Sequence, residues 1–577
     1  MFAEKLVATS EVARGVRPAS LMLQGGRVVN LFTRDIIEAD LLIEGDQIAA
    51  IGTGYPAGEE VIDLAGSYII PGLIDAHIHL ESTLLLPGHF AAAVLPRGTT
   101  AVIADPHEIA NVLGLGGIEY MLAATENLPL DFYFMVPSCV PSTEMETAGG
   151  EITPAQVEEL LDHPRVLGLA EMMNYPGVIH GDRVVAAKIA AAQQRGKPVD
   201  GHLPAMIGKD LQAYLAAGIS TDHEAVSAAE ALEKVSLGMR VIIREGSAAR
   251  NLSDLLPAVK TAGSRWFMFG SDDKEAEELL QAGHMDEILR RAVQQGCDPL
   301  AAVEMAALNP ALHYGLHRRG AVAPGYRADL AVVDDLQTFR VGLVIKDGQV
   351  VVREGELAAE VPSLPPGGEL LQTVRLLRVL GAEDFALRAG PGPVPIIGII
   401  PEQIITEKLM LEPKRAENGA IEPDLQRDIV KVAVVERHRR SGRIAVALLR
   451  GLGLRRGAIA SSVAHDSHNI IVAGVDEAAM ATAVNTLARC GGGFVAAESA
   501  GEVSALLPLP VAGLISPEPA AGVAAALKKV TAAARALGAS PPQPFLTLSF
   551  LALPVIPHLK ITDCGLFDVD SFSFVRF

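Results

Sequence analysis

Short apolar segments alternate with amphipathic segments through the first half of the chain. Stretches such as 186–195, 210–217 and 225–235 have helical spacing and lie between apolar runs of strand length. The eight expected strands span residues 69–79, 99–105, 131–138, 166–172, 198–202, 219–223, 240–245 and 266–270. Eight strand–helix units over roughly 250 residues have the size and order of a (β/α)8 barrel. A doubly wound open sheet is the alternative, but it gives no reason for polar residues to end so many strands.

The segments on either side of this region show a different pattern. Residues 1–68 and 318–362 contain short apolar runs separated by turn signals, among them Gln24-Gly25-Gly26, Gly45-Asp46 and Asp347-Gly348. An Asp-Gly pair between two apolar runs is typical of a tight β-hairpin. We therefore predict that the two flanks form one small composite β-sandwich domain beside a barrel domain.

A Pro- and Gly-rich segment at residues 362–368 indicates a linker. Beyond it, residues 370–577 are expected to form a further α/β domain that contains the strand-sized apolar segment 394–400 and the segment 428–437, whereas 370–380 fits either a helix or a strand. The prediction is thus an α/β protein with a TIM-like barrel over residues 69–317, a composite β-sandwich and an extra C-terminal α/β domain.

Composition and charge exclude several classes of function. The 577 residues are 49% hydrophobic, 20% charged and carry a formal net charge of −21, which argues against a nucleic-acid or anionic-membrane surface. The cysteines form no Cys-x-x-Cys pair, charges interrupt the N-terminus too early for a signal peptide, and no apolar run reaches the ~18 residues of a membrane span. We expect a cytoplasmic protein without nucleic-acid or membrane partners.

The first barrel strand ends in Asp-Ala-His-Ile-His-Leu-Glu at residues 75–81. Side chains two positions apart on a strand point to the same face, so His77 and His79 can bind one ion while Ile78 packs the other way. Neutral histidine is the commonest metal ligand. A lone His-x-His pair more often has a structural role. Whether this pair binds a metal therefore depends on the residues at the ends of the other strands.

Further histidines and acids recur at the ends of four other expected strands: Glu171, His202, His223 and Asp272. Active sites of such barrels lie at the C-terminal ends of the strands. Four imidazoles and two carboxylates fit two metal ions, which lower the pKa of a shared water for hydrolysis, and Asp272 can accept the proton of that water. Each residue alone could instead be a packed imidazole or a helix cap; it is their conjunction that favours a metal site.

One similar motif is excluded. His79-Leu80-Glu81 matches the His-x-Glu half of the zinc nucleobase deaminase signature, but the chain lacks the Pro-Cys-x-x-Cys that must follow it.

Three stretches, 71–82, 105–112 and 457–469, carry a resemblance to known proteins. The first resembles the amidohydrolase superfamily as a whole. The other two, Asp-Pro-His-Glu-Ile-Ala-Asn-Val and Gly-Ala-Ile-Ala-Ser-Ser-Val-Ala-His-Asp-Ser-His-Asn, resemble its adenine deaminase family. The likeness covers essentially the whole chain, including the C-terminal domain.

The resemblance implies that a metal-activated hydroxide attacks C6 of adenine, which gives hypoxanthine and ammonia. It implies two divalent ions, Mn or Fe by preference and Zn as an alternative, and a homo-oligomer of two or more subunits. Carried over by position, the first ion is held by His77, His79 and Asp272, the second by His202 and His223, and both by Glu171.

Two questions stay open at this level. Ring N1 of adenine needs a proton donor, for which Glu81, Glu224 and Glu108 are candidates; each could instead orient a metal-binding histidine. The segment His465-Asp466-Ser467-His468 is interpreted as a structural or site-covering motif that contributes to the adenine pocket or to a subunit contact.

Two other functions compete with adenine deamination. The nearer one is another amidohydrolase, either a cyclic amidase or a deaminase of a modified purine, because barrel ligands set the reaction type and the pocket sets the substrate. The more distant one is a non-catalytic scaffold, which should have lost at least one of the metal ligands.

Overall fold

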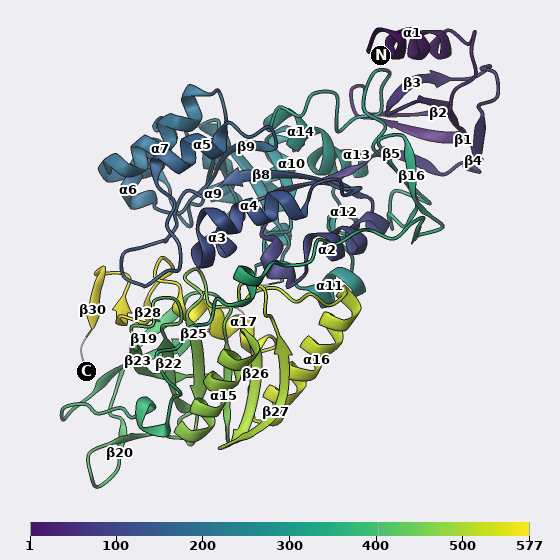
Figure 1. The fold of residues 1–577 in the computed structure, drawn as a ribbon. Helices are drawn as coiled ribbons and strands as arrows, with labels where there is room; N and C mark the ends of the chain where they lie inside the picture. Colours follow the sequence, from purple (N-terminus) through teal and green to yellow (C-terminus); the bar gives the residue numbers. More distant parts are fainter. Residues whose placement is uncertain (1, 248, 402, 576–577) are drawn as a thin grey trace.

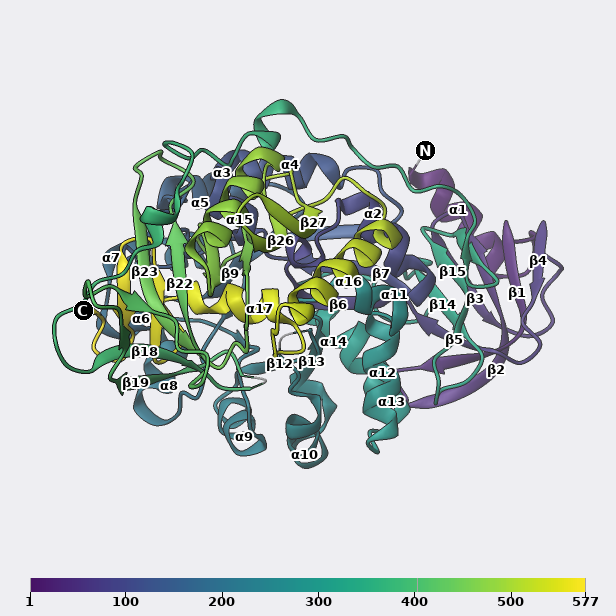
Figure 2. The same ribbon diagram turned by 90° about the horizontal axis from the view of Figure 1, so that it is seen from below.

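The computed structural model describes residues 2–247, 249–401 and 403–575. The barrel occupies the centre of the molecule, with a β-rich unit at one end and the C-terminal unit against another side (Figure 1). Figure 2, seen from below, places the C-terminal unit in front of the barrel. The predicted α/β class and the barrel are confirmed, whereas the exact domain boundaries stay predictions.

All eight predicted barrel strands are present. They run in two parallel sheets with the orders β10-β9-β8-β7-β6 and β11-β12-β13. Their bounds are β6 Leu73–Ile78, β7 Thr99–Ala104, β8 Asp131–Val136, β9 Val166–Met172, β10 Val199–Gly201, β11 Thr221–Asp222, β12 Arg240–Arg244 and β13 Phe267–Gly270. Small and apolar side chains of these strands, such as Ala76, Ile103, Ala170 and Ile242, pack together in the interior.

Hydrogen bonds close the two sheets into a barrel at both seams. At the seam of β6 and β13, the Asp272 N–H donates to the His77 carbonyl (2.9 Å), and the His79 N–H donates to the Asp272 carbonyl (3.3 Å). At the seam of β10 and β11, the Ser220 N–H donates to the Val199 carbonyl (2.9 Å). The first seam therefore brings together three predicted metal ligands that are almost two hundred positions apart in the sequence.

Helices surround the barrel between the strands. They are α2 Pro87–Val94, α3 His107–Leu113, α4 Leu115–Ala124, α5 Pro154–Leu161, α6 Tyr175–His180, α7 Arg183–Gln194, α8 Gly208–Ala216, α9 Ala228–Ser236, α10 Leu252–Ala262, α11 Ala276–Gln281, α12 Met285–Gln294, α13 Pro299–Val303 and α14 Asn309–His313. The three helices named from the sequence correspond to α7, α8 and α9. Side-chain caps at Asp182 and Ser227 set where α7 and α9 begin.

Strands from both flanks join in one sheet of nine strands that share an apolar core. The antiparallel pairing of β5 with β14 links the two flanks. The strands are β1 Leu21–Asn30, β2 Asp35–Glu44, β3 Gln47–Gly52, β4 Glu60–Asp63, β5 Tyr68–Pro71, β14 Leu330–Val333, β15 Val341–Lys346, β16 Gln349–Arg353 and β17 Glu356–Leu357, with α1 Phe2–Ala13 beside β3. The sequence analysis did not anticipate α1.

The turn signals of this sheet had different outcomes. Asp347 and Gly348 have φ of 52° and 76° between β15 and β16, so the predicted hairpin is confirmed. The turn at Gln24–Gly26 was wrong: these residues stay within β1, where the pairing with β2 shifts register between Leu23 and Gly26. Gly25 has φ of 66°, so the glycine pair forms a bulge instead of reversing the chain.

The C-terminal unit is built on an eight-stranded sheet of order β19-β18-β23-β22-β25-β24-β26-β27. The strands are β18 Val394–Ile399, β19 Thr406–Leu411, β22 Ile429–Val435, β23 Ile444–Arg450, β24 Ala458–Ser461, β25 Ile470–Gly474, β26 Gly493–Ser499 and β27 Glu502–Pro508. Smaller strands are β20 Lys414–Arg415, β21 Ile421–Glu422, β28 Leu559–Thr562, β29 Gly565–Asp568 and β30 Ser573–Val575, and the helices are α15 Glu477–Cys490, α16 Ala520–Ala536 and α17 Pro544–Ser549.

The strand-sized segment 394–400 forms β18, and the segment 428–437 contains β22. The ambiguous segment 370–380 forms only a short 3-10 helix, Gly368–Leu371, followed by irregular chain. In the part of the chain that the structure describes, we find no helix with the length and apolar character of a membrane span.

Gly201 provides a test of the barrel seam. A Cβ at this position would lie 2.3 Å from the Thr221 carbonyl oxygen, between the strands that precede His202 and His223. We predict that Gly201→Ala lowers the free energy of unfolding by about 1–3 kcal/mol through overpacking, and lowers metal content because the two histidines separate. Urea unfolding and metal analysis measure both effects.

Gly342→Ala is the matched control, because Gly342 lies in β15 and a Cβ there meets no heavy atom within 4 Å. Equal stability and metal content in the two variants would show that the seam does not require a glycine.

Candidate metal centre and substrate cavity

The six predicted metal ligands converge at the C-terminal ends of the barrel strands. All six side chains belong to buried residues. His77 is in β6 and Glu171 in β9. The others follow strands: His79 comes directly after β6, His202 after β10 and His223 after β11, and Asp272 lies two positions beyond the end of β13.

Glu171 lies between two groups of imidazoles. Its Oε1 is 3.3 Å from His79 Nε2, whereas its Oε2 is 2.7 Å from His202 Nδ1 and 3.1 Å from His223 Nε2. Burial opposes ionisation of this carboxyl, but the charge of His223 and hydrogen bonds from His202 and His223 lower the pKa of Glu171 well below its usual value. The two oxygens of one carboxylate thus face different histidines.

Asp272 lies beside the histidines of the first strand. Its Oδ1 is 3.2 Å from His79 Nε2 and 3.8 Å from His77 Nε2. The His77 ring also stacks on that of His223, with centroids 4.2 Å apart and planes 20° from parallel. This stack brings the two groups of histidines into contact across the barrel.

The arrangement of the imidazoles and acids fits metal ions. The His79 Nδ1–H donates to the Asp105 carbonyl (3.2 Å), which leaves Nε2 directed at Glu171 and Asp272. His77 Nε2 is buried without a hydrogen-bond partner, and burial together with the imidazoles of His223 and His79 holds the pKa of His77 well below its usual value. Neutral imidazoles and ionised carboxylates are the ligand forms that divalent cations need. The residues present therefore fit divalent metal ions.

Arg244 is a site residue that sequence reasoning missed. Its buried guanidinium donates from Nη1 to Asp272 Oδ2 (2.9 Å) and from Nη2 to Glu224 Oε2 (2.8 Å). Burial opposes ionisation of Asp272, but the hydrogen bond from His79 and the charge of Arg244 lower the pKa of that carboxyl well below its usual value. The signal was present, since Arg244 ends an apolar barrel strand as the predicted ligands do.

Asp105 and His107 were likewise missing from the predicted set. His107 Nδ1 is 3.0 Å from Asp105 Oδ2 and 3.5 Å from Glu171 Oε1, and its ring packs on His79 with centroids 4.5 Å apart. Both residues belong to the Asp-Pro-His-Glu motif that follows β7, from which the sequence analysis took only Glu108 as a candidate site residue.

Glu108 joins the barrel to the C-terminal unit. Its Oε1 lies 2.6 Å from His465 Nδ1, and its Oε2 pairs with His468 Nε2. His468 Nδ1 accepts the Ala464 N–H (3.2 Å), so the proton of the neutral ring is on Nε2, toward Glu108. Burial opposes ionisation, but the charge of His465 and the adjacent imidazoles of His468 and His107 lower the pKa of Glu108 well below its usual value.

The remaining candidate acids differ in location. Glu224 lines the cavity and pairs with Arg244, whereas Glu81 does not line it and accepts the Ile109 N–H (3.0 Å). Burial raises the pKa of Glu81 to about 7. The structure therefore places Glu108 and Glu224 at the cavity and Glu81 behind it, beside α3.

Both domains line this cavity. The barrel contributes the ligands and their neighbours: His79, His107, Glu108, Glu171, Met173, His202, His223, Glu224, Arg244, Ala249, Asp272 and Asp273. The opposite wall belongs to the C-terminal unit: Ile404, His465, Asp466, Phe550, Leu553 and Ile556. The site is thus enclosed between two parts of the chain.

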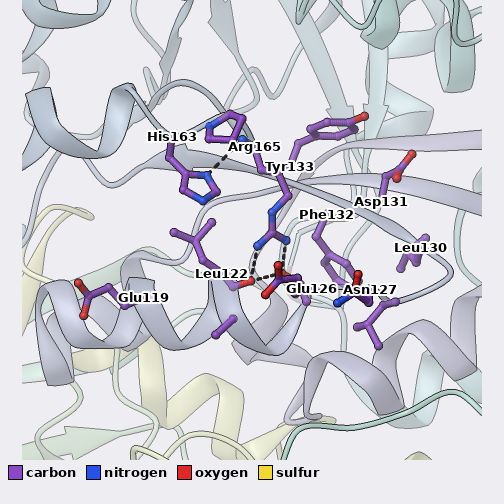
Figure 3. Close-up of a pocket in the computed structure, with 14 residues that line it drawn as sticks. Glu119, Leu122, Glu126, Asn127, Leu130, Asp131, Phe132, Tyr133, His163 and Arg165 are labelled. Carbon is purple, nitrogen blue, oxygen red and sulfur yellow. Dashed lines mark hydrogen bonds between the residues drawn. The ribbon is translucent and has the colours of Figure 1, made fainter. Parts of the chain in front are cut away.

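A larger hollow, about 710 Å³, lies at the other end of the barrel strands (Figure 3). Asp131 begins β8 and Arg165 directly precedes β9, so this hollow is at the N-terminal ends, where barrel enzymes do not place their chemistry. The Arg165 guanidinium, which lines this hollow, already donates hydrogen bonds to Thr125 Oγ1 (2.7 Å) and to the Leu122 carbonyl. Size alone therefore does not identify the site.

Arg244 generates a testable prediction. Arg244→Met leaves two carboxylates buried without their guanidinium, which should cost about 3–5 kcal/mol of unfolding free energy. Adding Glu224→Gln removes one of those charges, so the double variant should recover part of the loss. Urea unfolding of chelator-treated proteins completes the double-mutant cycle. Additive effects of the two substitutions would contradict a direct charge pair.

Comparisons with known proteins agree with this geometry. A model of the amidohydrolase family matches residues 68–351, and a model of the adenine deaminase C-terminal domain matches residues 403–573. The chain is 47% identical to an adenine deaminase of Desulfatibacillum aliphaticivorans (98% of each chain) and 47% identical to one of Methanothrix thermoacetophila (99% of each). It is 44% identical to an adenine deaminase of Kosmotoga olearia over 98% of this chain and 97% of that one. The chain therefore belongs to the adenine deaminase family.

Proposed function

We propose that this protein hydrolyses adenine to hypoxanthine and ammonia. The similarity to adenine deaminases over nearly the full length carries the proposal, because it includes both walls of the cavity. In the reaction, the oxygen of water adds to C6 of the purine and one of its protons is taken up by ring N1. The second proton of the water passes to the exocyclic amino group, which leaves as ammonia when the C6–N bond breaks and the C6 carbonyl forms.

Two divalent cations complete the proposed site. His77, His79 and Asp272 would hold one, His202 and His223 the other, and Glu171 both, in line with its two oxygens facing different histidines. Mn or Fe is the proposed metal, with Zn as an alternative, since imidazole and carboxylate ligands accept all three. When bound, such ions supply Lewis acidity, which lowers the pKa of water and makes hydroxide accessible at neutral pH.

Asp272 is the proposed general base. Its low pKa keeps the carboxylate ionised and able to accept a proton from the attacking water. Arg244 holds Oδ2 in place through one hydrogen bond (2.9 Å), which orients the carboxylate as a fixed acceptor. Arg244 is therefore a positioning residue.

Attack at C6 places negative charge on ring N1, which then takes up a proton. Glu108 is paired with His465 and His468, Glu224 is paired with Arg244, and Glu81 lies outside the cavity lining. These contacts favour positioning roles for all three. We therefore assign the transfer to Asp272, which carries the proton of water to N1.

The assembly and the compartment are also proposals. Phe32, Ile36 and Ile37 are 53%, 42% and 37% exposed near the turn between β1 and β2, a position suited to contact with a second copy in a homo-oligomer. All four cysteines, Cys139, Cys297, Cys490 and Cys564, are free thiols, which supports a reducing compartment such as the cytoplasm.

A substrate panel tests the proposed function. We expect the Mn-loaded protein to release ammonia from adenine in preference to guanine, cytosine and adenosine, and to leave dihydrouracil unopened. Removal of the metal with a chelator should abolish the release, and added Mn should restore it. Ring opening of dihydrouracil without turnover of adenine would instead support a cyclic amidase.

A further inference from the structure

The wall contributed by the C-terminal unit has a distinct composition. Ile404, Phe550, Leu553 and Ile556 are apolar, whereas His465 and Asp466 are its polar members. They come from three separate segments: the chain between β18 and β19, the loop between β24 and β25, and the segment from the end of α17 to β28. A flat, mostly apolar ligand fits such a surface, and its few polar groups give the orientation.

Buried contacts fix this wall in place. Lys560 Nζ donates to the carbonyls of Ile404 (2.8 Å) and Phe550 (3.0 Å), which ties two of the three segments together. The His465 ring stacks on Phe550 with centroids 4.7 Å apart and planes 23° from parallel. His465 Nδ1 is bound to Glu108 of the barrel (2.6 Å). The wall is therefore a preorganised surface rather than a loose loop.

Asp466 is the unusual group of this wall. Asp466 is 3% exposed, and its Oδ2 is buried without a hydrogen-bond partner. Its Oδ1 lies 4.0 Å from His107 Nε2, beyond hydrogen-bond distance. Among the described carboxylates that line the cavity, Glu108 is the other one with a buried oxygen that lacks a hydrogen bond, and that Oε2 pairs with His468 Nε2. Asp466 Oδ2 has no such ion pair. A buried acceptor left in this state costs about 1–3 kcal/mol, so it marks a position where a ligand donor would fit.

The ligand must supply an N–H at this wall. A carboxylate that is ionised only accepts hydrogen bonds. Adenine as the free base has one ring N–H, in its imidazole half, which is N9–H in the major tautomer. C6 must face the barrel ligands, so the imidazole half is directed toward the opposite wall. A nucleoside has a sugar carbon on N9 and offers no donor there.

We propose that Asp466 binds the ring N–H of the free purine base and thereby makes the enzyme select bases over N9-substituted purines. The inference rests on the proposed function and assigns a specificity-determining residue to that same cavity. His465 and Phe550 support it by holding the wall that presents Asp466. The C-terminal unit then acts as part of the substrate site and not only as a cover.

The test compares adenine with 9-methyladenine in wild type and in Asp466→Asn, both loaded with Mn. We expect wild type to prefer adenine by at least about 100-fold in kcat/KM, because a site built for an N–H rejects an analogue that lacks it. Asp466→Asn should raise KM for adenine about tenfold or more and change kcat far less. The preference for adenine over 9-methyladenine in kcat/KM should fall by about tenfold. Its metal content should stay that of wild type.

Asp570→Asn is the matched control, an exposed aspartate of the same unit whose side chain is 54% accessible. Asp466→Asn should fold, because the lost charge had no partner through Oδ2. If it does not fold, Asp466→Glu displaces the carboxylate by one methylene and should change KM and selectivity in the same direction.

The outcomes separate the two proposals. Wild type that deaminates adenine, with unchanged KM and unchanged preference in the Asp466 variants, overturns this inference and leaves the proposed function standing. Wild type that releases no ammonia from adenine overturns both. Loss of metal in Asp466→Asn would show a structural role and would also overturn the inference.

Discussion

A single buried carboxylate, Glu171, organises the site around it. Removing a carboxylate from water is costly unless counter-charges and hydrogen bonds surround it. Here His79, His202 and His223 approach its two oxygens at 2.7–3.3 Å, and these contacts keep its pKa low despite burial. The barrel must close with both seams in register to bring these side chains together, so the electrostatics of the site depend directly on backbone hydrogen bonding.

The C-terminal unit pairs a second buried carboxylate with histidines. Glu108 is buried at the barrel mouth and pairs with His465 and His468, which lie at least 357 positions further along the chain. Separating the two units would break the pairing of Glu108 with His465 and His468. The pairing therefore couples enclosure of the cavity to docking of the C-terminal unit. Exclusion of water from the cavity strengthens every remaining charge interaction inside it.

Much of the fold and of the metal centre could be predicted from the sequence, because the residue patterns that indicate them are local. The strand that ends in His77 and His79 and the Asp347-Gly348 hairpin depend on residues adjacent in the chain. Arg244 was missed because an arginine at a strand end resembles a solvated terminus until its acidic partners are known. The Gln24–Gly26 bulge was taken for a turn because glycine pairs favour both. Asp466 was named only as part of a motif, since its lack of a partner is a property of the assembled cavity.

The central claim is that two cations share Glu171 at the mouth of the barrel. Anomalous diffraction from crystals of the Mn-loaded protein, recorded on both sides of the Mn absorption edge, tests it most directly. The account predicts two Mn peaks beside Glu171, one adjoining His77, His79 and Asp272 and the other adjoining His202 and His223. A single peak, or peaks remote from Glu171, would contradict it.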